Sequence, residues 1–258
     1  MPEARARRDS RGVLPTLRGI AAVLVGWCFT TVYCTALTLL SIVTLRHWAR
    51  TWVAPAAHVW ARALLALCGV RVDYDNASTL RSRAARVVLI NHPSTLDAVW
   101  AALVMPPAAL PIGKREMIYY PGLNLAWWAL RFGLIDRSNP EAARGTLAAL
   151  VERVRCERLS ILVAPEGTRS RDGSLQAFKK GAFHLALQAG VPICPVVAAG
   201  AHAIWPRHRW LPVPGVVRIR FLPPFETRDW RIADLDAHIE RVHTAMQLAL
   251  HELEPGAG

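Results

Sequence analysis

The sequence predicts an α/β domain with a largely parallel central sheet flanked by helices, preceded by an N-terminal membrane-associated helical segment. One observation is an uncharged apolar run at residues 19–45. The other is that short strand-like runs alternate with helical patterns from about residue 71 onward, the order typical of a parallel sheet. We therefore expect two parts: residues 1–70, a basic tail followed by membrane-embedded or interfacial helices, and residues 71–258, the α/β domain.

The apolar run contains 27 residues, from Gly19 to Leu45. As a helix it would be about 40 Å long, against about 30 Å of bilayer hydrocarbon. A signal peptide is the competing interpretation, since Arg5, Arg7, Arg8 and Arg11 lie ahead of the run, but the run exceeds an ordinary signal core and lacks a small-residue cleavage site. A buried core helix is also disfavoured, because the run has no polar face.

Residues 46–70 mix arginines with tryptophans, which is typical of a helix lying at a membrane interface. We expect Pro55 to interrupt this helix or to begin its second half. Positive charge flanks the apolar run on both sides, so its orientation stays open. Two arrangements are compatible with the pattern: a tilted span, or a helical hairpin that enters and leaves one leaflet.

The remaining elements follow in order along the chain. In SNPEAARG we expect Asn139 to cap a helix and Pro140 to take its first position, and we expect Gly190 to end a later helix. Strands are predicted at residues 70–74, 86–92, 109–113, 160–164, 191–200 and 217–225, and helices at 95–105, 138–159, 179–190 and 231–252.

Net charge and cysteine content limit the classes of partner. A formal charge of +12 favours anionic partners, whether phosphorylated small molecules, acidic carrier proteins, lipid headgroups or nucleic acid. The five cysteines are odd in number and none has close metal-ligand spacing, so we expect reduced thiols in a cytoplasmic-facing protein and no metal site.

Three polar clusters each follow a strand-like run: NHPSTLD (91–97), the pair Asp136 and Arg137, and PEGTRS (165–170). The carboxyl ends of parallel strands meet at one edge of a sheet, so we expect the clusters to share a crevice. Lys114 ends another strand and could add positive charge there.

In the first cluster, His92 and Asp97 have the chemistry of a general base and its orienting carboxylate, provided that the chain folds back at the start of the next helix. A structural histidine is the alternative. Ser94 allows an esterase interpretation, but no G-x-S-x-G elbow is present. We expect Ser94 instead to cap a helix that begins at Thr95.

The third cluster has the residue types of a phosphate site. Gly167 lets the backbone approach a ligand, Thr168 and Ser170 supply hydroxyls, and Arg169 supplies a fork suited to phosphate oxygens. Glu166 would orient Arg169 or bind a substrate hydroxyl. The alternative is an ordinary surface turn with a solvated ion pair.

These motifs resemble those of glycerolipid acyltransferases, and most closely the 1-acyl-glycerol-3-phosphate acyltransferases. The resemblance covers NHPSTLD and APEGTRS (164–170), with Ala164 where phenylalanine is common. The other matching blocks, in chain order, are GKREM (113–117), GLIDR (133–137), FKKGAF (178–183) and VPICPV (191–196). The run before Asp136 is shorter than the family's usual strand.

The resemblance implies transfer of an acyl group from a thioester to the sn-2 hydroxyl of lysophosphatidic acid. His92 would be the general base, Asp97 its orienting partner and Lys114 a stabiliser of the oxyanion or the phosphate. The implied substrate-binding residues are Asn91, Arg137, Glu166, Gly167, Thr168, Arg169 and, shaping the acyl or thioester pocket, Pro192. Lys179 and Lys180 belong to a matching block without a defined role.

The resemblance also implies no cofactor and no metal, with acyl-CoA or acyl carrier protein as the acyl donor. The expected partners are a lysophospholipid acceptor, that donor and a bilayer with anionic lipids, but no nucleic acid. The expected location is the inner (cytoplasmic) membrane, with the catalytic domain facing the cytoplasm. Three other functions stay open: acylation of another lysolipid such as lyso-ornithine lipid, a Ser94 esterase or lipase, and a non-enzymatic lipid-binding module.

Overall fold

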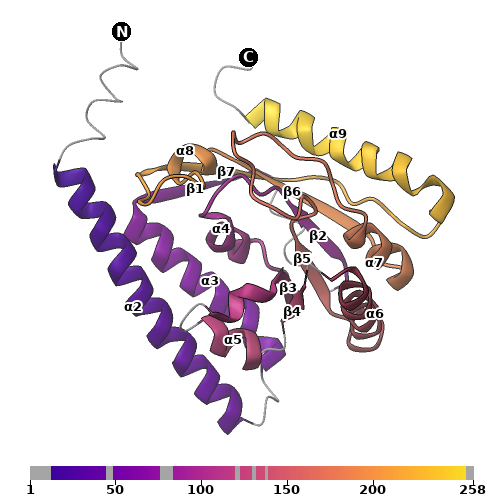
Figure 1. Cartoon of the computed structure of the whole chain (residues 1–258), viewed down its shortest axis with the longest axis horizontal. Helices are drawn as coiled ribbons and strands as arrows, with labels where there is room; N and C mark the ends of the chain where they lie inside the picture. The colour runs from indigo at the N-terminus through magenta and orange to yellow at the C-terminus, as the bar shows by residue number, and fades with distance from the viewer. Residues whose placement is uncertain are drawn as a thin grey trace.

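The computed structural model describes residues 13–44, 49–75, 84–119, 123–129, 132–136 and 139–253. A central sheet lies between two layers of helices, and a long helix pair runs along one side (Figure 1). The strands are β1 (Val70–Asp75), β2 (Val87–Ile90), β3 (Ala109–Lys114), β4 (Gly133–Ile135), β5 (Ser160–Val163), β6 (Ile193–Ala199) and β7 (Gly215–Phe221). The α-helices are α2 (Val13–Val43), α3 (Ala49–Cys68), α4 (Asp97–Leu103), α5 (Leu123–Ala129), α6 (Pro140–Glu157), α7 (Gly181–Ala189), α8 (Ala201–Ile204) and α9 (Leu235–Leu253), with short 3₁₀ helices η2 (Arg115–Tyr119) and η3 (Ile232–Asp234).

The sheet has the strand order β1-β7-β6-β2-β5-β3-β4. All of its neighbouring strands are parallel except β6 and β7, which are antiparallel. The prediction of an α/β domain with a largely parallel sheet is therefore confirmed. The sequence pattern did not reveal that β1 and β7 run against the other strands.

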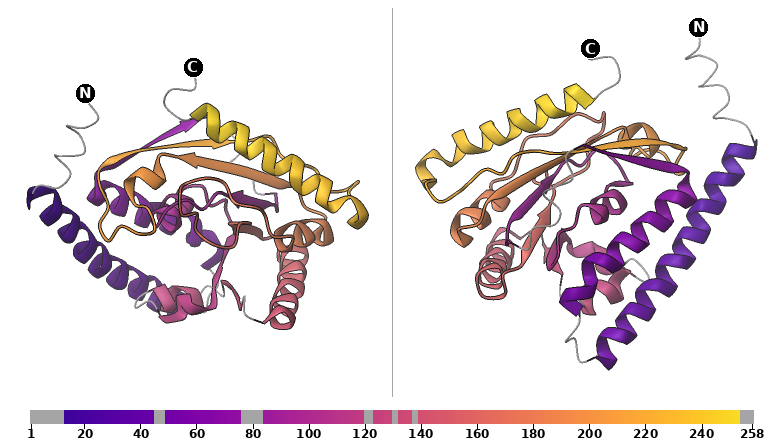
Figure 2. Two further views of the ribbon diagram at one scale, coloured as in Figure 1. Left: turned by 45° about the horizontal axis from the view of Figure 1, so that its top comes forward. Right: turned by 180° about the vertical axis from the view of Figure 1, so that it is seen from behind.

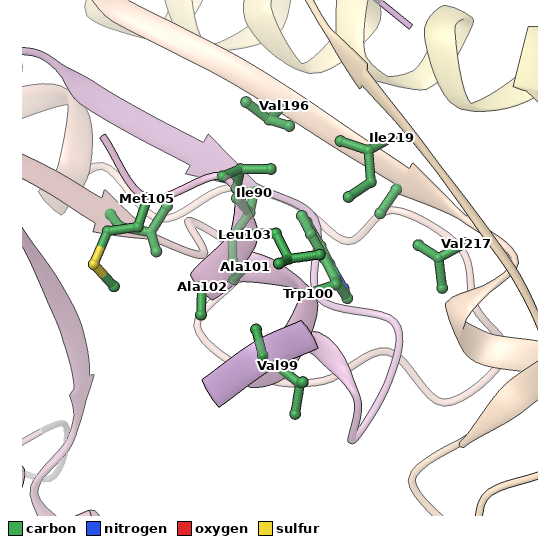
Figure 3. Packing of buried hydrophobic residues seen from close by; sticks show 14 of the residues in the cluster. Ile90, Val99, Trp100, Ala101, Ala102, Leu103, Met105, Val196, Val217 and Ile219 are labelled. Carbon is green, nitrogen blue, oxygen red and sulfur yellow. The ribbon is translucent and has the colours of Figure 1, made fainter. Parts of the chain in front are cut away.

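Both faces of the sheet are covered, which explains why its central strands are apolar without alternation. In β2, Val88 and Ile90 pack into a cluster beneath α3 and α4, whereas Val87 and Leu89 pack into a second cluster beneath α6, α7 and α9. Figure 3 shows the first cluster, in which the Trp100 ring from α4 lies among side chains of the sheet.

Helix ends follow the expected signals in two places and differ in two others. The Asn139 side chain accepts from Glu141 N and Ala142 N at 3.1 Å each, and Gly190 ends α7 with a φ of 68°. The predicted Ser94 cap is wrong, because α4 begins at Asp97 and its cap residue, Leu96, makes no side-chain cap bond. The predicted break at Pro55 is also wrong, because α3 continues through this residue, whose ring lies on its exposed face.

Helices α2 and α3 form an antiparallel hairpin, seen from behind in Figure 2. Hydrogen bonds join them: Tyr33 Oη donates to Ala56 O, and Trp60 Nε1 donates to Thr30 Oγ1, both at 3.0 Å. The buried side of α2 consists of small residues: Gly19, Ala22, Gly26, Thr30, Cys34, Thr38 and Ser41. Its exposed side carries large apolar ones, including Leu24, Val32 and Leu39, each more than half exposed. Close approach through small residues, with large apolar side chains outward, is the pattern of a helix in lipid.

Residues 16–43 of α2 form the one described helix that is long and apolar enough to cross a membrane. Helix α5 packs against the C-terminal half of α2 (Figure 1). The sequence pattern predicted neither α5 nor η2.

Candidate active site

The first and third polar clusters lie side by side because β2 and β5 are neighbouring parallel strands. His92 follows the end of β2 and Glu166 follows the end of β5. Since Leu89 pairs with Val163, the continued register sets His92 level with Glu166. The expected convergence of these two clusters at the carboxyl edge of the sheet is confirmed.

His92 and Asp97 are hydrogen-bonded, with 2.8 Å between Nδ1 and Oδ2. The fold-back that this contact requires is the turn at Thr95 and Leu96, after which α4 begins with Asp97. A carboxylate can only accept, so in the neutral ring Nδ1 carries the proton and Nε2 is the basic nitrogen. The His92 side chain is 28% exposed, which leaves the ring partly accessible to solvent.

The Asp97 carboxylate is fully enclosed, with 1% of its side chain exposed. Oδ2 also accepts from Ser94 N at 2.7 Å, and Oδ1 accepts from Trp100 Nε1 at 2.7 Å. Burial raises the pKa of the Asp97 carboxyl, and the hydrogen bonds of its three donors act in the opposite direction. The carboxylate is thereby held in one orientation toward His92.

Glu166 fixes the backbone of His92 rather than the side chain of Arg169. Its Oε1 accepts from His92 N at 2.6 Å, and its Oε2 accepts from Gln176 N at 3.1 Å. Burial raises the pKa of Glu166 to about 7, although both backbone hydrogen bonds lower it. The expectation that Glu166 orients Arg169 is wrong, because its two oxygens serve the backbone on either side.

Two further hydrogen bonds join the clusters. Ser170 N donates to His92 O at 2.9 Å, and Arg169 Nη1 donates to Thr95 Oγ1 at 2.7 Å. The main chain of His92 is thus held on both sides by the PEGTRS segment. Arg169 is half-buried, and its guanidinium has five N–H donors, one of which is used in the bond to Thr95.

The PEGTRS loop has a defined conformation. Gly167 adopts a φ of 75°, a region that favours glycine. Beyond it, Ser170 Oγ donates to Asp172 Oδ1 at 2.9 Å and accepts from Gly173 N at 3.0 Å. Hydrogen bonds from Ser174 and Ser170 lower the pKa of Asp172 to about 2. Thr168 lies exposed at the tip, where its hydroxyl is open to solvent.

The geometry is unfavourable to Ser94 as a nucleophile. The residue is completely buried, and its Oγ donates to Trp205 O at 2.7 Å while it accepts from Leu96 N at 3.0 Å. His92 Nδ1 bonds Asp97 instead of this hydroxyl. Ser94 therefore shapes the turn before α4.

Two predicted substrate residues lie elsewhere. Asn91 is buried, and its amide bonds both backbone groups of Ala198 in β6, at 3.0 and 2.8 Å. Pro192 precedes β6, where its carbonyl accepts from Val87 N at 2.9 Å. Val87 pairs with Ile193, so Pro192 is level with Arg86 and lies about 20 Å along the strand direction from His92, at the opposite edge of the sheet. Asn91 joins two strands, and Pro192 is not brought together with His92.

The structure describes only part of the positively charged residues that were predicted for the site. The backbone of Lys114 ends β3, two strands from β2, at the level of Pro165, and therefore about 10 Å from His92. The Lys114 side chain and the whole of Arg137 lie outside the described residues. Lys180 Nζ pairs with Asp236 of α9 at 2.6 Å, and Lys179 is exposed beside it.

Three residues at the site were missed from the sequence. They are Trp100, which bonds Asp97, Gln176, which bonds Glu166, and His202, whose Nδ1 lies 3.0 Å from Pro93 O. A tryptophan three positions after Asp97, one helical turn on, was the one available local signal. Among the described residues, no group of three or more His, Cys, Asp or Glu side chains could hold a metal ion. The described side chains thus set an imidazole with a basic Nε2 beside a loop that carries hydroxyl and guanidinium groups.

Comparison with known proteins gives a consistent result. A family model described as Acyltransferase matches residues 71–199. The 1-acyl-sn-glycerol-3-phosphate acyltransferase of Limnanthes douglasii is 32% identical over 244 residues, covering 93% of this chain and 85% of the relative. The protein of the same name from Salmonella typhimurium is 33% identical over 189 residues, covering 72% of this chain and 76% of the relative.

Among solved structures, the 1-acyl-sn-glycerophosphate (LPA) acyltransferase PlsC from Thermotoga maritima matches with a TM-score of 0.79, covering 92% of this chain and 95% of the other at 23% identity. This likeness concerns the fold, and it confirms the predicted glycerolipid acyltransferase-like architecture.

Proposed function

The chain belongs to the 1-acyl-sn-glycerol-3-phosphate acyltransferase family, and we propose that it transfers an acyl group from acyl-CoA or acyl carrier protein to the sn-2 hydroxyl of lysophosphatidic acid, giving phosphatidic acid. The observation that carries the proposed mechanism is the His92–Asp97 pair at 2.8 Å, with the carboxylate buried and the imidazole partly exposed at the edge of the sheet.

In the proposed reaction, His92 Nε2 takes the proton of the acceptor hydroxyl as its oxygen attacks the thioester carbonyl. Asp97 stabilises the imidazolium that forms. Collapse of the tetrahedral oxyanion breaks the carbon–sulfur bond, and the leaving thiolate takes the proton from the imidazolium. No acyl-enzyme forms, so the kinetics are sequential. Holding both substrates in one crevice supplies much of the rate enhancement.

The PEGTRS loop is the proposed phosphate site. Gly167, Thr168 and Arg169 present backbone, hydroxyl and guanidinium groups beside His92, and such groups bind phosphate oxygens. We include Arg137 and Lys114 as further positive charges on the strength of the family motifs. Because the loop is hydrogen-bonded to the His92 main chain, it would hold the phosphate of the acceptor lipid at a fixed position relative to the base.

We propose that residues 1–70 anchor the α/β domain of residues 71–258 to the inner membrane, with the domain on the cytoplasmic side. Both ends of α2 are held by this domain: Leu211 lies against Gly19, and α5 packs near the other end (Figure 1). A spanning helix would carry one end across the bilayer. The hairpin in one leaflet is therefore the arrangement we favour, with the bilayer as the source of the acceptor and the thioester donor arriving from solution.

The test is a panel of lysolipids with one labelled acyl thioester, in detergent micelles, with products identified by mass. We expect phosphatidic acid from lysophosphatidic acid, loss of about 10²–10⁴-fold in turnover for His92→Ala, and retention of turnover for Ser94→Ala. An acyl-serine trapped in the wild type, or transfer to a headgroup amine, would overturn the assignment.

A binding module without catalysis would show no turnover with any thioester in the wild type. Separate trials with acyl-CoA and acyl carrier protein identify the donor.

A further inference from the structure

The loop between α8 and β7, residues 206–214, is basic and aromatic. Its sequence, PRHRWLPVP, contains two arginines and a histidine but no acidic residue. Trp210 is 90% exposed, the highest value among the large apolar side chains that the structure describes as exposed. A single exposed tryptophan needs no explanation by itself, but this one lies in a distinctive setting.

The loop is held in a fixed conformation. Trp205 Nε1 donates to Arg209 O and Arg209 N donates to Pro206 O, both at 3.1 Å, and Val213 N donates to Ile204 O at 3.1 Å. The rings of Pro206 and Pro212 are buried. Trp210 is therefore held out in solvent by a structured turn.

The loop begins at the active site. Trp205 O accepts from Ser94 Oγ at 2.7 Å and from Thr95 N at 2.9 Å, and both residues belong to the His92 segment. A shift of the loop would therefore act directly on the turn that carries His92.

The loop ends at the membrane hairpin. A Cβ on Gly19 would lie 3.1 Å from Leu211 Cβ, and the Arg18 guanidinium and Pro214 both lie against Gly69. Arg18 and Gly19 mark the point where the apolar run of α2 begins. Two exposed apolar residues of α2 adjoin this point: Leu17 and Ile20, which are 57% and 41% exposed.

We propose that the 206–214 loop is a second membrane contact, in which Trp210 enters the headgroup region of an anionic bilayer and Arg207 and His208 face lipid phosphates. Tryptophan is enriched at that depth, and the cationic side chains of the loop are attracted to an anionic leaflet. The inference rests on the proposed action at a bilayer. An acidic carrier protein would suit the same charges, but continuity with the apolar side of α2 favours lipid.

The first experiment uses Trp210→Phe in the full chain, reconstituted in vesicles of phosphatidylcholine and phosphatidylglycerol with brominated acyl chains. The difference in fluorescence between the wild type and Trp210→Phe is the signal of Trp210. We expect brominated lipid to quench that signal and aqueous acrylamide to leave it largely unquenched. Trp230→Phe is the matched control, because Trp230 stacks on His238 beside the start of α9, far from α2 (Figure 1). Its signal should be insensitive to brominated lipid.

The second experiment compares turnover in vesicles and in micelles for Trp210→Ala and Arg207→Glu, with Arg228→Glu as the charge control. We expect at least a fivefold rise in the apparent KM on anionic vesicles for both loop variants, with turnover in micelles unchanged.

A Trp210 signal quenched by acrylamide and not by brominated lipid overturns the proposal, as does protection of that signal by acyl carrier protein alone. Absence of turnover in micelles for the wild type would instead contradict the proposed function.

Discussion

Two groups of polar contacts in this chain have similar donor–acceptor distances but differ in how deeply their side chains are buried. Around His92, Asp97 and Glu166 accept hydrogen bonds of 2.6–3.1 Å from side chains and backbone. On the other side of the sheet, Lys180 reaches Asp236 of α9 at 2.6 Å. The Asp97 side chain is 1% exposed, whereas that of Asp236 is 75% exposed.

The difference shows that burial, and not contact length, determines what a polar contact contributes. A buried carboxylate that loses a donor has no water to replace it, and the cost is about 1–3 kcal/mol for each unsatisfied group. An exposed ion pair exchanges its partner for water and contributes about 0–1 kcal/mol. Substitutions matched between the two groups test this comparison.

Asp97→Asn should have the largest effect. An asparagine offers one acceptor oxygen where the carboxylate offers two, and its amide carries no charge. With its oxygen in the place of Oδ2, facing His92 and Ser94, its NH₂ group opposes the indole N–H of Trp100 and displaces the side chain from its orientation toward His92. The negative charge that stabilises the imidazolium is lost as well. We expect turnover to fall by about 10²–10⁴-fold and the free energy of unfolding to fall by about 1–3 kcal/mol.

Initial rates in micelles and denaturant unfolding measure the two effects. The matched control, Asp236→Asn, should change neither appreciably. Turnover in Asp97→Asn above a tenth of the wild-type value would contradict an orienting role for this carboxylate.

Glu166→Gln should change how stability depends on pH. The pKa of Glu166 in the folded chain is about 7, above the ordinary value of 4.5, because the carboxyl is buried. A raised pKa means that its stabilising contribution is full below pH 4.5 and is lost as pH rises toward and through 7. The wild type should therefore lose stability relative to Glu166→Gln between about pH 5 and 8.

Unfolding midpoints measured across that range provide the check, with Glu252→Gln as the control. Glu252 is an exposed carboxylate beside Arg220, and its substitution should give a constant difference from the wild type. A difference between wild type and Glu166→Gln that stays constant with pH would show that Glu166 is ionised throughout.

Trp100→Phe should have an intermediate effect. The substitution removes the indole N–H from Asp97 Oδ1 and keeps most of the ring volume in the first cluster (Figure 3). We expect a loss of about 1–3 kcal/mol in unfolding free energy and a severalfold decrease in turnover with little change in KM. The pH profile of turnover should also shift, because Asp97 is held less firmly.

Ile219→Val is the control for packing alone, with an expected loss of about 0.5–1.5 kcal/mol. Ile219 belongs to the same cluster, but its side chain has no hydrogen-bond donor for Asp97, so the pH profile of Ile219→Val should match the wild type. If Trp100→Phe and Ile219→Val both keep the pH profile of the wild type, Trp100 contributes packing alone.

The sequence was informative wherever the determinant is local or follows from parallel topology. Asn139 and Gly190 mark helix ends through their own side chain or backbone, and His92 and Asp97 meet within one turn. Convergence of the NHPSTLD and PEGTRS clusters required only that β2 and β5 be parallel neighbours.

What was not predicted depends on contacts between distant segments. Glu166 is paired with a backbone N–H 74 residues away, and no side-chain pattern records a backbone donor. The placement of Pro192 at the far edge depends on the register between β6 and β2. By contrast, the small residues on the buried side of α2 recur every three or four positions, a local pattern that indicates a packing surface in the sequence itself.

The smallest effect is expected for Lys180→Ala, although Lys180 lies in one of the family's sequence blocks. Its partner, Asp236, is mostly exposed, and the pair joins the start of α7 to the start of α9. We expect less than about 1 kcal/mol of lost stability and unchanged turnover. A double-mutant cycle with Asp236→Ala should give a coupling energy of about 0.2–1 kcal/mol that decreases with added salt. A large loss of turnover in Lys180→Ala, with Asp236→Ala still active, would mean that Lys180 leaves Asp236 to reach substrate and that the exposed group of contacts also serves catalysis.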